Sequence, residues 1–302
     1  MRAQYSDPGP DDMVRVAILG GSGKMGRWFA AQLTGDGKEV VISGRTEAKL
    51  LEAKRQLGVE TASNVEAVKS ADAVLFSVPI ESFADVVREV GPHIRPGQIV
   101  VDITSIKVLP VDLMHRHIGQ GTVLGGHSLF GPGARSLVNQ NIILTPTSEP
   151  EAALAEKVRV YLENRGAKVS LMTPQEHDEM MTVILGLAHF IAIASADTLL
   201  SVGKLRQMAP IGGITYKVLL TLVESVISED PELYASLQMN LPGLADMEKL
   251  FQRKARWWTD LVERKDRRQF IQRIGELRAE LERNAPDFGR AYENMYRLVE
   301  WL

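Results

Sequence analysis

The chain has 302 residues, of which 45% are hydrophobic and 24% are charged, which is typical of a soluble globular protein with two domains. Its formal net charge of −3 provides no basic surface for nucleic acid, so the expected partner is a small molecule. Because the chain has no cysteine, disulfides, thiolate-bound zinc and iron–sulfur clusters are excluded.

The first 13 residues are polar, contain Pro and Gly, and lack the apolar stretch of a signal peptide. We interpret residues 1–13 as a flexible leader. No apolar run approaches the roughly 20 residues that span a bilayer. The sequence therefore predicts a cytoplasmic protein that has no membrane contact.

Short β-branched runs alternate with amphipathic stretches over residues 14–171. The runs VRVAIL, VVIS, AVLFSV and QIVVDI each predict a strand buried on both faces, and the stretches between them predict right-handed helical crossovers. Further runs at TVLGG, NIILTP and AKVSLM extend the sheet. The pattern predicts an α/β domain with a Rossmann-type, doubly wound parallel sheet.

Strand signals disappear after Met172, so residues 172–302 are predicted to form an all-helical domain. Thr173, Pro174 and Glu176 mark a helix start, and the helix from about 174 to 201 is very apolar in its middle. The apolar stretch MAPIGGITYKVLLTLVESVI follows it. These helices have more apolar surface than one domain covers, which predicts a homodimer built on this domain.

The stretch LGGSGKMG follows the first predicted strand and opens a helix. Its glycines have the G-x-G-x-x-G spacing of a dinucleotide-binding loop, in which they allow a tight turn, close approach of a pyrophosphate and packing of helix on strand. The helix N-terminus adds N–H donors and the positive end of a dipole. The predicted loop residues are Gly21, Ser22, Gly23, Lys24, Met25 and Gly26.

The end of the second strand indicates which nicotinamide cofactor binds. An acid at this place would bind the ribose hydroxyl of NAD, but here Ser43, Arg45 and Thr46 precede the first acid, Glu47. A guanidinium beside small hydroxyl residues suits a 2′-phosphate. The residues favour NADP, with NAD as the alternative.

Polar and small residues follow the next three strands, where open α/β sheets bind ligands. Ser77, Val78 and Pro79 follow the fourth strand and are predicted to pack on the nicotinamide. Ser105 and Lys107 follow the fifth strand, and His127 follows the sixth in the stretch GGHSLFGPGARSL. A hydroxyl, an ammonium and an imidazole are thereby predicted to meet in one crevice.

These motifs, together with EHDEMM, GLAHF and DPELYASLQM, resemble the prephenate dehydrogenase family in order and rough spacing. The similarity is greatest to archaeal members and to the dehydrogenase half of bacterial enzymes fused to chorismate mutase. The resemblance implies oxidative decarboxylation of prephenate to 4-hydroxyphenylpyruvate, with hydride passing to the nicotinamide. Arogenate and 4-amino-4-deoxyprephenate are the alternative substrates.

The resemblance also implies roles for individual residues. His127 would take the proton of the ring hydroxyl, Ser105 would hydrogen-bond that hydroxyl or His127, and Lys107 would add positive potential for a dianionic substrate. His177 and Asp178 match a His-Asp pair of the family. His189 matches a histidine that faces the active site.

The chain departs from the family pattern at two places. Ser128 stands where a proline commonly follows the catalytic histidine. Lys217, after Tyr216, stands where bacterial members place an arginine that binds a substrate carboxylate, and an ammonium cannot form the same two-pronged contact. Arg135, Arg206 or Lys107 would then assist in carboxylate binding.

We predict no metal site. His177 and His189 lie twelve residues apart, which places them about 120° apart around a helix. Two other readings of the chain stay open. It could be another NADP oxidoreductase, such as a deazaflavin-dependent NADP reductase, or a regulatory protein that senses NADP without turnover.

Overall fold

The computed structural model describes residues 14–300, and the leader predicted for residues 1–13 lies outside them. The chain forms two compact units, the first ending at Met180 and the second beginning at Met181. This division lies beyond the boundary predicted after residue 171. The reason is that His177 and Asp178 hydrogen-bond to residues of the first unit.

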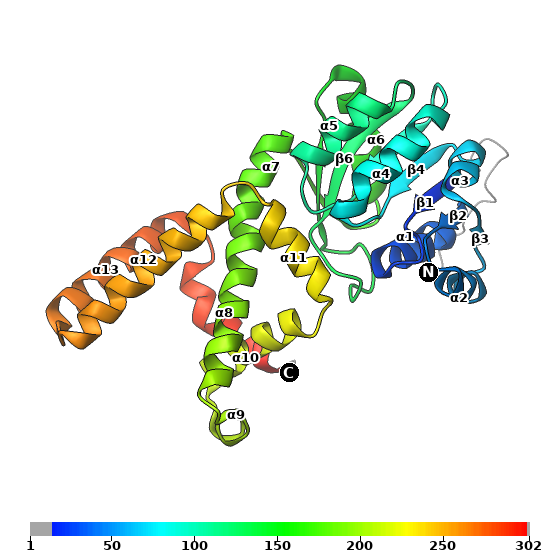
Figure 1. Ribbon diagram of the computed structural model, residues 1–302. Coiled ribbons are helices and arrows are strands. Elements are labelled where there is room, and N and C mark those ends of the chain that lie inside the picture. The colour runs from blue at the N-terminus through cyan, green and yellow to red at the C-terminus, as the bar shows by residue number, and fades with distance from the viewer. Residues whose placement is uncertain (1–13, 301–302) are drawn as a thin grey trace, which may run out of the picture. The chain divides into compact units, whose positions relative to one another are not determined.

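The described residues of the first unit contain one eight-stranded sheet with the order β3-β2-β1-β4-β5-β6-β7-β8 (Figure 1). The polarity of the order changes between β1 and β4, as expected for a doubly wound sheet. The strands are β1 (Arg15–Leu19), β2 (Glu39–Ser43), β3 (Glu60–Thr61), β4 (Ala73–Phe76), β5 (Ile99–Asp102), β6 (Thr122–Ser128), β7 (Asn141–Thr145) and β8 (Lys168–Leu171).

The sheet is mostly parallel, with one antiparallel pairing between β6 and β7. The predicted doubly wound parallel sheet is therefore confirmed, with this one pair of strands as an exception. Residues 129–140 connect the two strands without a helix, so the chain turns straight back, whereas a parallel pair needs a crossover. β8 is parallel to β7 because α6 provides such a crossover.

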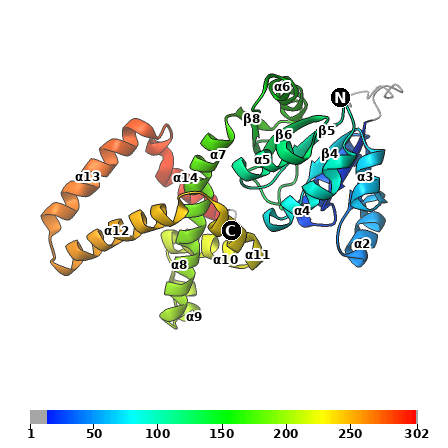
Figure 2. The same ribbon diagram turned by 45° about the horizontal axis from the view of Figure 1, so that its top comes forward.

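Helices cover both faces of the sheet (Figure 2). Ala17 and Leu19 of β1 pack with α3, α4 and α5, whereas Val16 and Ile18 pack with α1 and α2. This alternation follows from the two-residue period of a strand. The helices are α1 (Lys24–Gly35), α2 (Glu47–Leu57), α3 (Asn64–Ser70), α4 (Ile80–Val90), η2 (Gly91–His93), α5 (Val108–His117), α6 (Glu149–Glu163) and α7 (Pro174–Met181).

The described residues of the second unit form helices joined by short connections, with no strand among them, which confirms the prediction for the C-terminal region. α8 and α10 pack against each other, and α14 packs on α10. The helices are η3 (Thr182–Leu187), α8 (Ala188–Ser201), α9 (Leu205–Met208), η4 (Ala209–Ile211), α10 (Ile214–Ile227), α11 (Pro231–Asn240), α12 (Leu244–Glu263), α13 (Arg267–Asn284), η5 (Phe288–Arg290) and α14 (Ala291–Glu300).

The helical run Pro174–Ser201 is long and apolar enough to cross a membrane, by length and composition alone. Little of its most apolar part is buried in the structure. The expectation that no segment meets this criterion is wrong, because residues 182–201 contain a single charged side chain, Asp197. An apolar helix at a protein interface meets the same criterion, since it too is hydrophobic on most sides.

Candidate active site at the carboxyl edge of the sheet

The glycine loop lies between β1 and α1 and leaves no room for side chains. Gly20 has a positive φ of 79°, and a Cβ added to it would lie 2.3 Å from the Ser77 carbonyl oxygen. A Cβ on Gly21 would meet Ile42 at 2.6 Å, and one on Gly26 would lie 2.6 Å from the Gly20 oxygen. Gly20 is thus the position whose backbone conformation requires glycine, and the motif spacing did not identify it. The glycines at 21 and 26 are explained by close packing.

The N-terminus of α1 suits a phosphate group. No side chain caps it, and its first turn contains no acid. Uncapped N–H groups at the positive end of a helix dipole bind anions. Arg27 of α1 stabilises the loop, because its Nε donates to the Ser22 carbonyl at 3.1 Å and its guanidinium pairs with Glu52 of α2 at 3.0 Å. These residues fit a dinucleotide.

The residues predicted to select the cofactor differ in exposure. Ser43 is buried, and its hydroxyl donates to Asn64 Oδ1 at 2.7 Å. Arg45 and Thr46 are exposed at the start of α2. Ser77 and Val78 are half-buried next to Gly20, and Pro79 precedes α4. The guanidinium of Arg45 is therefore open to solvent, whereas the hydroxyl of Ser43 is not.

The ends of β1, β4, β5 and β6 lie next to one another at one edge of the sheet. Three strand spacings separate β1 from β6, which is roughly 14 Å. The glycine loop and His127, the last residue but one of β6, are therefore at the same edge. An extended dinucleotide is long enough to connect them.

Lys107 is fully buried and does not lie open in this crevice. Its ammonium pairs with Asp102 Oδ1, donates to the Gly126 carbonyl at 2.6 Å and lies 3.4 Å from Thr104 Oγ1. Thr104 also donates to Asp102 Oδ1 at 2.6 Å. Because its side chain is 0% exposed and its ammonium is bonded to Asp102 and Gly126, Lys107 is not open to direct contact with a substrate, and the positive potential that the resemblance implied would act at a distance.

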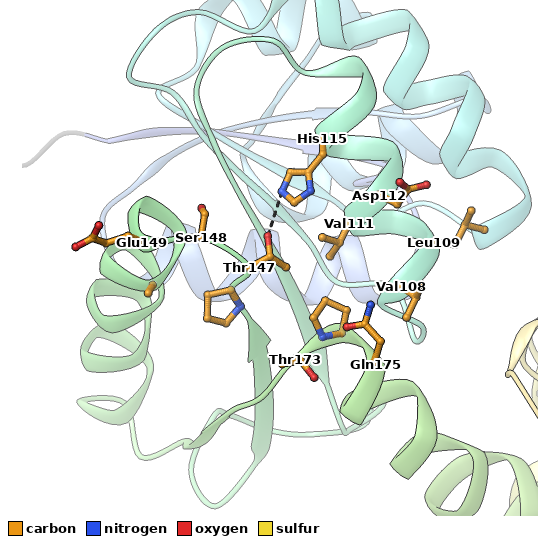
Figure 3. Close-up of a pocket in the computed structure, with 13 residues that line it drawn as sticks. Val108, Leu109, Val111, Asp112, His115, Thr147, Ser148, Glu149, Thr173 and Gln175 are labelled. Carbon is orange, nitrogen blue, oxygen red and sulfur yellow. Dashed lines mark hydrogen bonds between the residues drawn. The ribbon is translucent and has the colours of Figure 1, made fainter.

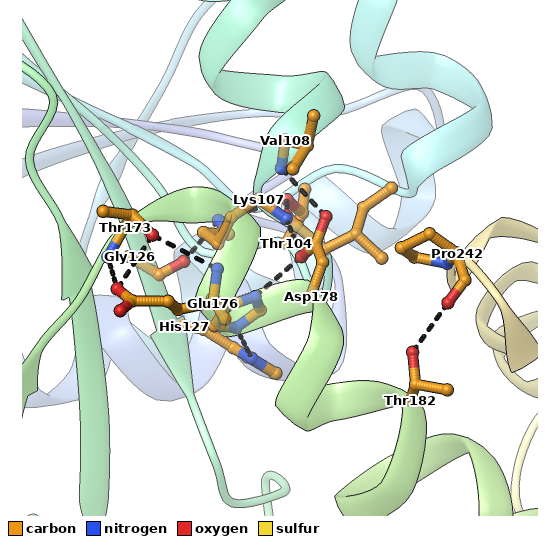
Figure 4. A network of polar contacts seen from close by, with 12 residues as sticks. Thr104, Lys107, Val108, Gly126, His127, Thr173, Glu176, Asp178, Thr182 and Pro242 are labelled. Carbon is orange, nitrogen blue, oxygen red and sulfur yellow. Dashed lines mark hydrogen bonds and ion pairs between the residues drawn. The ribbon is translucent and has the colours of Figure 1, made fainter.

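His127 is 4% exposed and has a histidine partner (Figure 4). Its Nδ1 lies 2.8 Å from His177 Nε2, and His177 Nδ1 lies 2.7 Å from Asp178 Oδ1. Asp178 in turn accepts from the backbone N–H groups of Lys107 at 2.6 Å and Val108 at 3.0 Å, at the N-terminus of α5. A carboxylate from α7 thus caps α5.

The pairing of His127 with His177 was missed in the sequence. The two residues are fifty positions apart, and the only signal was the His-Asp dipeptide at the start of a helix. Ser105, the predicted partner of His127, is half-buried, and none of the hydrogen bonds found among the described residues joins it to His127. The hydroxyl in the network is that of Thr104.

The surroundings keep His127 neutral. Burial lowers its pKa well below the ordinary value of 6.5, and the nearby His177 and Lys107 lower it further. Burial also lowers the pKa of Lys107, while the Asp102 carboxylate raises it. A neutral imidazole at neutral pH is able to accept a proton.

A pocket of about 870 Å³ in the first unit lies between α5, the start of α6 and the start of α7 (Figure 3). His115 lies in it and contacts Glu151 at 2.7 Å and Thr147 at 3.4 Å. Its lining includes neither the glycine loop nor His127. The described residues also contain no cluster of three or more His, Asp or Glu that could hold a metal ion.

The residues predicted to bind substrate are divided between the units. Arg135 is exposed in the loop after β6, next to Ala134, whose carbonyl accepts from Trp28 Nε1 at 2.6 Å. In the second unit, His189 packs edge-on against Tyr234, and its Nδ1 is buried without a hydrogen-bond partner. Burial lowers the pKa of His189. Tyr216 has a buried hydroxyl that is likewise unpaired, and Lys217 is exposed.

The fold and the glycine loop define a Rossmann-type dinucleotide-binding protein with a helical second unit. The family models are more specific. The nucleotide-binding domain of prephenate dehydrogenase matches residues 29–171, and the dimerization domain of prephenate dehydrogenase matches residues 173–276. The chain belongs to the prephenate/arogenate dehydrogenase family, which confirms the resemblance seen in its motifs.

Three similar proteins illustrate this membership. A probable arogenate/prephenate dehydrogenase of Methanocaldococcus jannaschii is 35% identical over 260 residues, 85% of this chain, and the match spans 58% of that protein. The T-protein of Haemophilus influenzae is 28% identical over 88% of this chain and 67% of its own length. The structure of prephenate dehydrogenase from A. aeolicus, in complex with hydroxyphenyl propionate and NAD+, superposes with a TM-score of 0.75 at 21% identity, covering 90% of this chain and 98% of that one.

Proposed function

We propose that this protein is a cytoplasmic prephenate dehydrogenase of tyrosine biosynthesis. It would convert prephenate to 4-hydroxyphenylpyruvate by oxidative decarboxylation with a nicotinamide dinucleotide. The observation that supports this most is the buried, neutral His127 at the same sheet edge as the glycine loop. Membership of the family supports the reaction class.

His127 would act as the general base. It takes the proton of the ring hydroxyl while the carbon that bears this hydroxyl loses hydride and becomes a carbonyl carbon. The nicotinamide, when bound, accepts that hydride. The ring carboxylate then leaves as carbon dioxide, its bonding electrons make the ring aromatic, and the ring oxygen takes the proton back. The buried Lys107 would act by its charge at a distance, since it adds to the effect of burial and of His177 in lowering the pKa of His127.

NADP is the cofactor that we favour, with NAD as the alternative. Arg45 is exposed at the start of α2, and Ser43 at the end of β2 stands where an NAD-binding acid would. A planar guanidinium forms paired hydrogen bonds to a phosphate. Thr46 adds a hydroxyl at the same turn.

Substrate recognition would involve His189, Tyr216, Lys217 and Arg135. Lys217 and Arg135 are exposed cations that can neutralise carboxylates. The unpaired polar atoms of His189 and Tyr216 are available to a ligand. Arogenate and 4-amino-4-deoxyprephenate stay the alternative substrates, because each differs from prephenate by one amino group.

The decisive experiment crosses NAD+ and NADP+ with prephenate and arogenate and follows the absorbance of the reduced nicotinamide. We expect the fastest turnover with prephenate and NADP+. A His127→Asn variant should bind NADP+ normally and lose turnover, whereas His93→Asn, a change at a half-exposed histidine of the same unit, should keep it. No turnover in any combination would refute the catalytic assignment and favour the NADP-sensing reading. Turnover only with a deazaflavin would favour the other oxidoreductase.

The second unit would form a homodimer. Its family model is a dimerization domain, and large apolar side chains of its first helices are exposed, among them Ile184 at 51% and Leu200 at 63%. Covering such side chains from water stabilises an interface. Sedimentation at micromolar concentration should show a dimer, and a monomer would refute the proposal.

A further inference from the structure

We propose that His177 and Asp178 are positioning residues that hold His127 in one tautomer, with Nδ1 protonated and Nε2 free to accept a proton. The consequence for catalysis rests on the proposed function. The tautomer itself does not, since it follows from the hydrogen bonds of the first unit.

The direction of each hydrogen bond follows from Asp178. Both carboxylate oxygens accept backbone N–H groups, Oδ1 from Lys107 and Oδ2 from Val108. An ionised carboxylate only accepts, so His177 Nδ1, 2.7 Å from Oδ1, is the donor. The other nitrogen of a neutral His177 is then an acceptor, and His127 Nδ1, 2.8 Å away, donates to it. The lone pair of His127 is left on Nε2.

Four charged or titratable groups surround His127. Asp102 is the last residue of β5, and Lys107 lies in the segment that follows this strand. His177 and Asp178 belong to α7. Lys107 and Asp102 neutralise each other, with both side chains 0% exposed. Lys107 still lowers the pKa of His127 from its place in that ion pair, whereas the Asp178 carboxylate is the charge connected to His127 by hydrogen bonds, through His177. When His127 takes a proton, this chain of hydrogen bonds stabilises the imidazolium.

A merely structural role does not explain this cluster. His177 is 0% exposed and Asp178 is 3% exposed, and burying polar side chains is unfavourable compared with an apolar contact between α7 and the sheet. Capping α5 requires Asp178 but does not require a histidine between it and His127. Polar groups buried together with a lowered pKa are typical of functional sites.

Nuclear magnetic resonance of the full-length protein labelled with nitrogen-15 in histidine tests the tautomer without substrate. His127→Asn and His177→Gln spectra assign the two rings. We expect His127 to carry its proton on Nδ1 at neutral pH. In Asp178→Asn the side-chain amide can donate to His177 Nδ1, which reverses the chain and moves the His127 proton to Nε2. A wild-type His127 protonated on Nε2 would overturn the proposal.

Kinetics test the consequence, with Glu179→Gln as the matched control on the same helix because Glu179 is exposed. Asp178→Asn and His177→Phe should lower kcat by about 10²-fold or more, while the Kd for NADP+ stays unchanged. His177→Gln, which keeps both an acceptor and a donor, should recover much of this loss. In Asp178→Asn the acidic limb of the kcat/KM profile should move to lower pH, because the imidazolium loses its carboxylate.

The two proposals fail in different ways. A correct tautomer in a protein that turns over neither prephenate nor arogenate refutes the proposed function and supports the positioning of His127. An Asp178→Asn variant with the kcat and pH profile of Glu179→Gln overturns the positioning role, even when the wild type is an active dehydrogenase. Should His177→Phe fail to fold, Asp178→Asn and His177→Gln still decide the question.

Discussion

Replacing Lys107 by methionine should destabilise the first unit strongly. Lys107 and Asp102 form an ion pair in which both side chains are 0% exposed, and Asp102 Oδ2 has no hydrogen-bond partner. Methionine has a similar length and no charge. Lys107→Met would leave the Asp102 carboxylate buried with only Thr104 as donor, and would remove the donor of the Gly126 carbonyl.

The expected loss is about 3–5 kcal/mol, the typical cost of removing one partner of a buried ion pair. Most of this cost arises because a charge is left without compensation. The double variant Asp102→Asn/Lys107→Met should therefore lose less than Lys107→Met alone, since an amide carries no charge. The exposed Lys157 of α6 is the control, and Lys157→Met should change stability by less than about 0.5 kcal/mol.

Urea unfolding at neutral pH measures these four proteins and the single variant Asp102→Asn, with the free energy of unfolding taken from the first transition. A loss below about 1 kcal/mol in Lys107→Met would refute the reasoning, because an uncompensated buried carboxylate cannot cost so little. So would a double variant whose loss equals the sum of the single losses, since that would mean the two charges are not coupled.

Three further changes test other parts of the site. Gly26→Ala should weaken NADP+ binding at least tenfold, because its Cβ would lie 2.6 Å from the Gly20 oxygen, while Gly35→Ala at the other end of α1 meets no atom within 4 Å and should leave binding unchanged. Arg45→Ala should raise the KM for NADP+ by about tenfold and leave that for NAD+ unchanged, and an equal effect on both would contradict NADP selection. Because burial lowers the pKa of His127 below 6.5, the acidic limb of the kcat/KM profile should lie below that pH. The same shift affects stability: as the pH drops below 6.5, His127 is protonated in the unfolded chain before it is protonated in the folded protein, so the free energy of unfolding should fall.

The fold could be predicted from the sequence to the level of sheet type and helix layers. The alternation of short β-branched runs with amphipathic stretches is a local signal, and it identified the strands that form the edge of the site. The antiparallel pairing of β7 could not be predicted in the same way. The composition of the run NIILTP indicates a strand but not the direction in which the strand pairs. That direction depends on whether residues 129–140 form a crossover helix, and they do not.

The site was predictable at positions where the backbone conformation or close contacts allow one residue type only. The glycine loop is such a case, because only glycine fits these contacts. The partners of His127 were not predictable, since His177 reaches it from a helix that begins after β8. Lys107 was predicted at the crevice because it follows the fifth strand. Its burial depends on Asp102 and the Gly126 carbonyl, two acceptors that no spacing rule connects.

The loop after His127 is held by the same helix that carries the dinucleotide loop. Trp28 of α1 donates to the Ala134 carbonyl at 2.6 Å and packs against Phe130, with the ring centroids 4.9 Å apart. A shift of α1 would therefore move both the glycine loop and the segment that follows His127. From the other side, α7 holds His127 through His177. If His127 is the general base that we propose, its fixed position would reduce the entropy lost in the reaction, and this pre-organisation would offset the unfavourable burial of the polar groups around it.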